Sequence, residues 1–188
     1  TPAWNPGLTL AQRTAATNLC DKQLSGYMFV ANGAVGDQPG RHAWHYLGPW
    51  QTLPDGSFIA AWKFVSPAQF NTIAAFNPSI PIYGFDTSAI PFPTADSPKV
   101  LLPCIAFNYL GQLTFDGQNL AWRDEYIPLA QGSVSPAINA STKAPVISVN
   151  NPPSITETPP GNSTNSMYRL IHIDRLTGRA TLEYQKVQ

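Results

Sequence analysis

The side chains best suited to acid–base or metal chemistry in this chain are its three histidines, His42, His45 and His172. On a helix, the spacing of His42 and His45 would place both on one face, as a metal pair requires. Their segment is instead typical of a strand or loop, where this spacing points the two side chains to opposite faces. Ordinary surface histidines are therefore the preferred interpretation, and a metal pair is the alternative.

His172 lies in an apolar run that predicts a strand, on the same face as Asp174. A His–Asp pair activates a Ser or Cys nucleophile, but the chain contains no Gly-x-Ser-x-Gly elbow. Cys104 follows a proline in an apolar run, with no neighbouring cation or helix terminus to favour its thiolate. The sequence therefore predicts a protein that is not an enzyme, with a hydrolase built on His172 as a distant alternative.

Carboxylates are sparse, with eight Asp and three Glu in 188 residues. Only Asp124 and Glu125 are adjacent, while Asp55 and Asp116 precede glycines and are typical of turns. A glycosidase pair assembled from distant strands stays open, because spacing alone does not exclude it. We expect no cofactor. The alternative is a structural calcium ion held by Asp side chains and loop carbonyls, without an EF-hand loop.

The composition disfavours nucleic acid as a partner. Eleven basic and eleven acidic residues give a net charge of zero, and they are scattered along the chain. Neither the Walker glycine motif nor Gly-x-Gly-x-x-Gly occurs, which disfavours nucleotide chemistry. Few charges, only 12%, together with many Asn, Thr, Ser, Pro and aromatic residues favour an extracytoplasmic location.

The two cysteines, Cys20 and Cys104, are expected either to form a disulfide in an oxidising compartment or to pack as two buried thiols. Two Asn-x-Ser/Thr sequons begin at Asn139 and Asn162, and they matter only in a eukaryotic source. The sequence leaves both questions open.

Apolar residues recur at helical spacing near the N-terminus and predict one amphipathic helix within residues 1–32. Asn5 and Pro6 are typical of a helix start, and Asn32-Gly33 of a helix end. The expected packing face consists of Leu8, Ala11, Ala15, Leu19 and Leu24.

The remainder, 33–188, is expected to be a β-rich head. Residues 44–50 and 58–65 predict neighbouring strands, 105–115 predicts a hairpin, and 168–187 predicts a terminal hairpin. Proline- and asparagine-rich stretches near 77–103 and 131–166 predict long loops. The expected fold is a single α+β domain over 1–188, with the helix packed on an antiparallel sheet.

Four segments carry a family resemblance through their order. They are Leu-Ala-Gln-Arg-Thr-Ala-Ala at 10–16, Leu-Pro-Asp-Gly at 53–56, the strand Ile-Ala-Phe-Asn-Tyr-Leu-Gly-Gln-Leu at 105–113, and Ile-Asp-Arg-Leu-Thr-Gly-Arg-Ala at 173–180. This order resembles the soluble head of bacterial type IV pilin-like proteins, particularly minor pseudopilins of type II secretion systems. The segments cover about a third of the chain.

The resemblance implies a non-catalytic structural subunit of an extracytoplasmic pilus or secretion pseudopilus. It also implies a membrane-anchored precursor, whose apolar half-helix upstream of Thr1 carries a cleavage and methylation site. The expected partners are other pilin or pseudopilin subunits, together with the inner membrane through that upstream segment. Assembly would proceed through the N-terminal helix.

The alternative function is an extracellular binding module of carbohydrate or adhesin type. Flat aromatic faces stack on sugars, and Trp44, Trp50 and Trp122 are the candidate platform residues. The competing interpretation is that these rings are buried in a β core.

Overall fold

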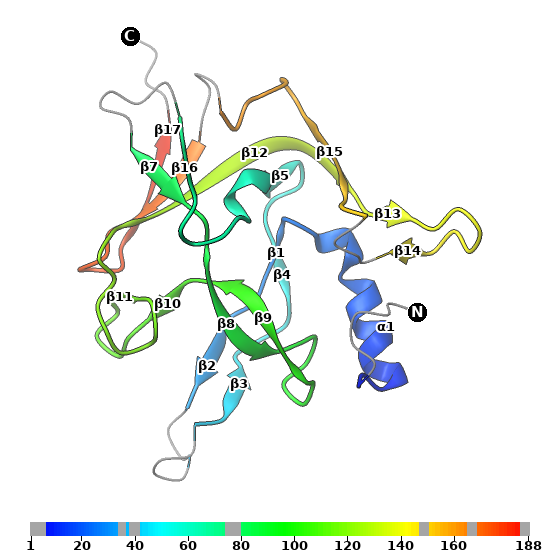
Figure 1. The fold of residues 1–188 in the computed structure, drawn as a ribbon, viewed down its shortest axis with the longest axis horizontal. Coiled ribbons are helices and arrows are strands. Elements are labelled where there is room, and N and C mark those ends of the chain that lie inside the picture. Colours follow the sequence, from blue (N-terminus) through cyan, green and yellow to red (C-terminus); the bar gives the residue numbers. More distant parts are fainter. Residues whose placement is uncertain are drawn as a thin grey trace. The chain divides into compact units, whose positions relative to one another are not determined.

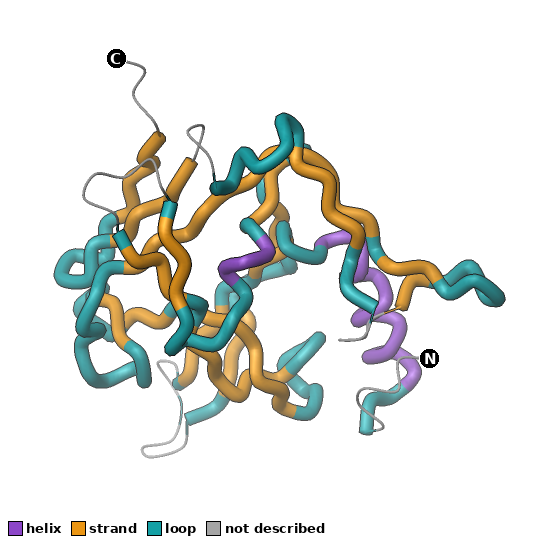
Figure 2. The backbone as a smooth tube through the Cα atoms, turned by 45° about the horizontal axis from the view of Figure 1, so that its top comes forward, coloured by secondary structure: helices purple, strands orange, loops and turns teal. Residues whose placement is uncertain are grey.

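The computed structural model describes residues 7–33, 37, 42–73, 80–146, 151–164 and 169–184. Strands make up 42% of the structure and helices 10%, as the predominance of strand in Figure 2 shows. The chain forms two compact units. Unit 1 comprises Thr1–Asp55, Ala89–Leu101 and Val134–Ile155, and unit 2 comprises Gly56–Ser88, Leu102–Ser133 and Thr156–Gln188.

Unit 1 contains the longest helix and several short strands (Figure 1). Its elements are α1 (Leu10–Asn18), the 3₁₀ turn η1 (Cys20–Lys22), β1 (Gly26–Tyr27), β2 (Val30–Asn32), β3 (Trp44–Tyr46), β4 (Gln51–Thr52), β13 (Ala137–Ile138) and β14 (Pro145–Val146). The pairs β1–β4, β2–β3 and β13–β14 are each antiparallel two-stranded ribbons.

Unit 2 holds most of the largest sheet. Its elements are β5 (Ser57–Ile59), the 3₁₀ turn η2 (Ala61–Lys63), β6 (Phe70–Thr72), β7 (Pro81–Tyr83), β10 (Ala106–Phe107), β11 (Leu113–Thr114), β16 (Arg169–Ile173) and β17 (Ala180–Tyr184). Four further strands cross the boundary between the units: β8 (Asp86–Pro91), β9 (Lys99–Cys104), β12 (Glu125–Ser135) and β15 (Ser154–Glu157).

The helix α1 starts at Leu10 because Thr9 and Gln12 form a capping box. The Gln12 amide donates to Oγ1 of Thr9 at 3.3 Å, and the Thr9 amide donates to Oε1 of Gln12 at 2.9 Å. After Asn18 the chain tightens into η1, and Leu24 then adopts φ = 61°, which ends any right-handed helix. Among the described residues, no helix combines the length and apolar character needed to cross a membrane.

The expected α+β fold, a long N-terminal helix packed on a sheet in the manner of pilins, is therefore wrong. The helix has nine residues rather than nearly thirty, and the structure around it is a set of small sheets. The helical spacing of apolar residues continues past Asn18, but the helical backbone does not. The Asn5-Pro6 start falls outside the described residues.

The expected packing face is divided in the structure. Leu8 is buried, Ala11 is exposed, and Ala15, Leu19 and Leu24 are half-buried. The fully buried positions of this segment include Ala16 and Cys20, which are four residues apart. The buried stripe is therefore rotated by about one residue from the one that the apolar spacing predicts.

The largest sheet has the strand order β15-β12-β16-β17, and β5 also pairs with β12. Strands β12 and β16 are antiparallel, from the pair Glu125–Ile173 to the pair Leu129–Arg169. Strand β5 pairs with β12 through Ile59 opposite Leu129. Of the described strands, β12 therefore has the most partners.

Each face of this sheet is covered by its own apolar cluster, because side chains alternate along β16. One cluster consists of Phe85, Leu113, Ile127 and Ile173. The other consists of Ile73, Ile82 and Leu170, with Trp62 and Tyr126 packed against it. Burial of apolar side chains at roughly 1.5–3 kcal/mol each makes both clusters principal contributors to the stability of unit 2.

The structure confirms two of the expected hairpins and corrects other strand predictions. The terminal hairpin is β16–β17, and the 105–115 hairpin is β10–β11. The predicted pairing of 44–50 with 58–65 is wrong, since β3 pairs with β2 and β5 with β12. The expected loop at 77–103 contains β7, β8 and β9, because two-stranded ribbons have free edges that tolerate proline. The expected loop at 131–166 contains β13, β14 and β15.

The turn between β16 and β17 is a glycine bulge. The Gly178 amide donates to the Asp174 carbonyl at 2.8 Å, and the Asp174 amide donates to the Arg179 carbonyl at 3.1 Å. Gly178 has φ = 63°, and a Cβ at this position would lie 1.9 Å from the Gly111 carbonyl oxygen. The turn therefore requires glycine both for its backbone conformation and for its space.

We expect Gly178→Ala to lower the free energy of unfolding by about 2 kcal/mol more than Gly117→Ala. Gly117 has φ = 85°, but a Cβ added there would have no atom within 4 Å, so its substitution carries only the conformational cost. Urea unfolding of both variants measures the difference. Equal losses would show that the close approach of Gly111 does not constrain this turn.

Candidate functional site

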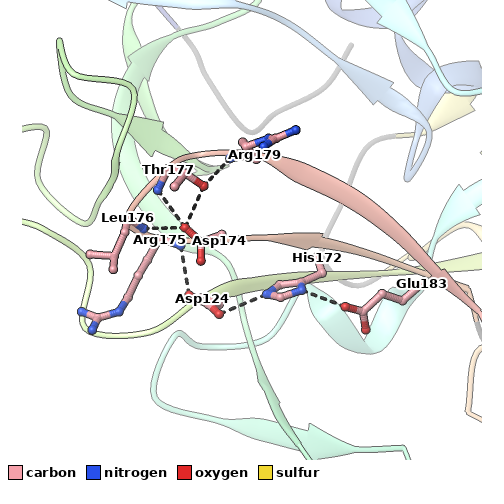
Figure 3. A network of polar contacts seen from close by, with 8 residues as sticks. All are labelled: Asp124, His172, Asp174, Arg175, Leu176, Thr177, Arg179 and Glu183. Atoms are coloured by element: carbon pink, nitrogen blue, oxygen red, sulfur yellow. Dashed lines mark hydrogen bonds and ion pairs between the residues drawn. The ribbon is translucent and has the colours of Figure 1, made fainter.

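His172 belongs to β16, and its ring lies between two carboxylates from other parts of the chain, as Figure 3 shows. Its Nδ1 is 2.8 Å from Oε1 of Glu183, and its Nε2 is 3.0 Å from Oδ2 of Asp124. The ring also stacks on Tyr126, with centroids 4.5 Å apart and planes inclined by 11°. Strand β16 thus holds His172 between the strand β17 on one side and the segment entering β12 on the other.

Asp174, the partner that the sequence suggested for His172, lies instead in the β16–β17 turn. Its Oδ1 accepts from the amides of Leu176 and Thr177 and from the Thr177 hydroxyl, at 2.8–3.0 Å. The hydrogen bond from the Thr177 hydroxyl, followed by that from the Thr177 amide, lowers the pKa of this carboxyl. Asp174 therefore shapes the turn, and Asp124 takes its expected place beside His172.

Partial burial acts to lower the pKa of His172, but hydrogen bonds to Asp124 and Glu183 outweigh it and raise the pKa above its ordinary value. A protonated imidazole donates from both ring nitrogens, which matches a carboxylate on each side. We call Asp124, His172 and Glu183 the histidine clasp. Both nitrogens are engaged, so the ring has no free nitrogen with which to activate a nucleophile.

The clasp also fixes the chain around it. Oδ1 of Asp124 accepts from the Arg175 amide at 3.0 Å, and the Arg175 side chain donates from Nη1 to the Ala121 carbonyl at 3.2 Å. The Arg175 carbonyl accepts from the Leu113 amide at 3.0 Å. The clasp therefore ties the entry of β12 to the β16–β17 turn and to β11.

A second polar pair lies inside unit 2. The Lys63 side chain is only 1% exposed, and its Nζ donates to Oε1 of Glu125 and, at 2.5 Å, to the Tyr83 carbonyl. The ammonium also lies 4.6 Å from the centroid of the Phe85 ring. Burial lowers the pKa of Lys63 and raises that of Glu125, and their mutual attraction opposes both changes. Such a pair is costly to break, because the remaining charge would be buried without a partner.

A cavity of about 30 Å³ lies beside this pair, with Asp86, Cys104, Thr114, Arg123 and Glu125 among its lining residues. It has room for about one water molecule and none for an organic substrate. Burial, followed by the charge of Asp86, raises the pKa of Cys104 to about 11. This thiol is protonated at neutral pH and is a poor nucleophile.

Cys20 and Cys104 are both free thiols in the structure, and they belong to different units. Burial, followed by the charge of Asp21, raises the pKa of Cys20. The disulfide between them stays a prediction. In the described ranges, no three His, Cys, Asp or Glu side chains are grouped to hold a metal ion.

An exposed aromatic cluster stands on unit 2, and we call Phe70, Tyr83, Trp122 and Arg123 the Trp122 cluster. Phe70 and Tyr83 are opposite each other in the β6–β7 hairpin, with ring centroids 5.3 Å apart. Trp122 meets Tyr83 edge to face at 5.4 Å. The Arg123 guanidinium lies 3.8 Å from the Tyr83 centroid and 4.5 Å from the Trp122 centroid, within cation–π range.

The Trp122 cluster is open to solvent and held in place. Trp122 is 66% exposed, although Tyr83 and Arg123 contact it. Arg123 also donates from Nη2 to the Pro67 carbonyl at 3.4 Å, which anchors the guanidinium. These contacts restrict the rings before any ligand binds, and this lowers the entropic cost of binding.

The other two predicted platform tryptophans are less exposed. Trp44 is half-buried in β3. Trp50 is half-buried as well, donates from its indole N–H to the Pro93 carbonyl at 3.3 Å, and packs edge to face on Phe92 at 5.7 Å. These contacts of Trp50 lie within unit 1, and of the three predicted residues only Trp122 presents an open ring.

His42 and His45, the candidate metal pair, have different neighbours. Nε2 of His45 lies 3.0 Å from Oδ2 of Asp37, and His42 lies beside Gly33.

The two sequon asparagines differ in their exposure to solvent. Asn162 is 5% exposed and its side chain bonds to the amide and carbonyl of Gln131, whereas Asn139 is exposed in the β13–β14 hairpin.

Unit 1 carries an exposed apolar groove of about 520 Å³. Its lining residues are Tyr27, Phe29, Leu47, Gly48, Pro49 and Gln51. Tyr27 and Phe29 meet edge to face at 5.7 Å, and the Leu47 amide donates to the Phe29 carbonyl at 2.9 Å. We call this surface the Phe29 groove.

Comparison with protein-family models, with curated proteins and with solved structures finds no match to this chain.

Sequence reasoning missed most of the residues that contact His172 and Trp122, because they lie far away along the chain. Asp124 is 48 positions from His172, and Phe70 and Tyr83 are both far from Trp122 along the chain. One local signal existed for Glu183, since alternation in the predicted terminal hairpin places it near His172 on the same face. No local pattern pointed to Lys63 as the partner of Glu125.

The histidine clasp predicts a defined pH dependence of stability. A folded pKa raised above the unfolded value of about 6.5 means that the stabilisation is fully present below about pH 6.5 and is lost as pH rises through the folded pKa. His172→Asn should therefore cost most stability in mildly acidic buffer, and the difference from wild type should shrink in mildly alkaline buffer. Urea unfolding across this range, with an NMR titration of the His172 ring, measures it. A loss that grows with pH would contradict a protonated clasp.

Proposed function

We propose that this chain is a non-catalytic structural subunit of an extracytoplasmic assembly, a pilus or secretion pseudopilus, in which it contacts other subunits through exposed apolar surfaces. The observation that carries the proposal is the number of large apolar side chains left open on both units. They include Leu10, Phe29, Leu47, Phe70, Leu101, Tyr109, Leu110, Trp122, Leu182 and Tyr184. Some of them lie together, Phe29 with Leu47 in the Phe29 groove and Phe70 with Trp122 in the Trp122 cluster, and contiguous apolar patches mark binding surfaces.

The polar residues support a role without chemistry. The imidazole of His172, between its two carboxylates, has both nitrogens engaged, and both thiols have raised pKa values. The small cavity beside Glu125 does not admit a substrate. In this proposal these side chains stabilise the fold, and the protein acts through its surface.

The helix remains a candidate assembly surface despite its short length. Leu10 is 80% exposed at the first turn, and Ala11 beside it is exposed. The other side of the same helix is buried at Ala16. One side of α1 thus serves the fold, and the other is open to a neighbouring subunit.

We expect Leu10→Glu in the full-length protein, expressed in its own host, to reduce recovery of the chain with the sedimented assembly about tenfold or more. The substitution places a charge where an apolar contact of about 1.5–3 kcal/mol would be buried. Asn18→Lys, at the exposed last position of the same helix, is the matched control and should assemble normally. Normal assembly of Leu10→Glu would exclude α1 as an assembly surface.

A second candidate function is that of an extracellular binding module for carbohydrate, and the Trp122 cluster favours it. An exposed indole beside a guanidinium offers a stacking face together with hydrogen-bond donors, a combination that suits a sugar ring and its hydroxyls. The indole N–H of Trp122 has no partner within the described structure. It would be available to a ligand.

Under this second function, Trp122→Ala should abolish binding on a glycan array, because the stacking face for the sugar ring and its preorganised contacts are lost together. Tyr109→Ala removes another highly exposed aromatic side chain, one outside the Trp122 cluster, and it should bind as the wild type does. The two variants should unfold at similar urea concentrations. Absence of any glycan signal from the wild type would leave the structural subunit as the sole proposal.

A further inference from the structure

Strand β17 ends the largest sheet, and its outer edge is unpaired in the part of the chain that the structure describes. Leu182 is 57% exposed and Tyr184 is 62% exposed. Both lie on the same face of the sheet as Ile171 and Ile173, because Leu182 is opposite Ile171 and Ala180 is opposite Ile173. This edge therefore offers free backbone groups next to apolar side chains.

The glycine bulge determines which backbone groups point outward. Asp174 is hydrogen-bonded to both Gly178 and Arg179. Asp174 and Arg179 are therefore a hydrogen-bonded pair in the ladder between β16 and β17. Hydrogen-bonded and non-hydrogen-bonded pairs alternate along an antiparallel ladder. Thr181 and Glu183 consequently bond towards β16, and the N–H and C=O groups of Ala180, Leu182 and Tyr184 face away from it.

We propose that β17 pairs with β17 of a second copy of this chain, antiparallel and about a twofold axis through Leu182. This register places Leu182 opposite Leu182 of the second copy, and Ala180 opposite Tyr184. These are the residues whose backbone groups point outward, so the ladder bonds form without any shift in register. Two sheets then join into one continuous sheet.

The side chains of the strand complement themselves in this register. The small Ala180 is opposite the large Tyr184, and the two leucines meet at the axis. Glu183 is opposite Thr181 rather than another Glu183, so no like charges meet, and His172 already pairs with the Glu183 carboxylate. A strand that faced itself one residue out of register would lose every one of these matches.

A second copy fits better than an unrelated partner because β17 complements itself in this register, and the edge also lacks common forms of protection. Residues 180–184 contain no proline, no lysine and no bulge, which are the common means of preventing edge-to-edge pairing. Five residues on each side make a small interface, below the roughly 1,000 Å² typical of stable complexes. We therefore expect a weak dimer whose population rises with protein concentration.

Cysteine trapping tests the register. Facing residues in a hydrogen-bonded antiparallel pair have Cα atoms about 5.5 Å apart, within the range of about 4.4–6.8 Å that a disulfide spans. Leu182→Cys should therefore give a disulfide-linked dimer under mild oxidation. Thr181→Cys is the matched control, because the two Thr181 residues would be diagonal neighbours about 8 Å apart. The wild type, whose cysteines are Cys20 and Cys104, shows how much disulfide-linked dimer forms through those two residues alone.

Trapping of Leu182→Cys well above both Thr181→Cys and wild type supports the proposal. Equal trapping of the two variants, or none, overturns it. Sedimentation of the untrapped protein gives a second test, in which the wild type should dimerise as concentration rises. Leu182→Lys should stay monomeric because like charges would meet at the axis. Dimerisation of Leu182→Lys at the wild-type level also overturns it.

This inference goes beyond the proposed function, since it uses neither α1 nor the Trp122 cluster. Leu10→Glu tests assembly through the helix, and the Leu182 variants test the sheet edge. If the Leu10→Glu test fails, the proposed pairing of β17 is unaffected, and if the Leu182 tests fail, the proposed assembly through α1 is unaffected.

Discussion

The pairing of β12 with β16 is the constraint on which the rest of unit 2 depends. Its register sets which side chains face each apolar cluster, with Ile127 and Ile173 on one side of the sheet and Leu170 on the other. The same alternation places His172 between Asp124 and Glu183. A slip of one residue would exchange the two faces and bury the imidazole in place of an isoleucine.

Polar groups reinforce this pairing at one end, where β12 begins. Glu125, the first residue of β12, accepts from the buried Lys63, and Asp124 before it accepts from His172 and the Arg175 amide. The Lys63–Glu125 pair is buried, whereas the histidine clasp is partly open to solvent. Large apolar and aromatic side chains remain exposed on α1, in the Phe29 groove, in the Trp122 cluster and on β17.

The sequence predicted elements whose signals are local. The terminal hairpin follows from alternation around Asp174 and Gly178, and the 105–115 hairpin from similar turn chemistry. The helix was predicted too long, because apolar spacing continues past Asn18 and does not reveal that the chain tightens there into η1 and turns left-handed at Leu24. The pairing of β12 with β16 was not predictable, and neither was Asp124 as a partner of His172, since no local pattern specifies that residues 48 positions apart will meet. Trp122 was named as a platform residue, but Tyr83 and Arg123 beside it were not.

Residue-resolved hydrogen exchange, measured at low and at high protein concentration, tests this account most directly. Strand β16 lies inside the sheet, between β12 and β17, and β17 leaves one edge free within the described residues. The account predicts that the amides of β16, together with Thr181 and Glu183, exchange slowest at any concentration. The amides of Ala180, Leu182 and Tyr184 should exchange rapidly in dilute protein and more slowly in concentrated protein. Rapid exchange throughout β16, or protection of Leu182 in dilute protein, would contradict it.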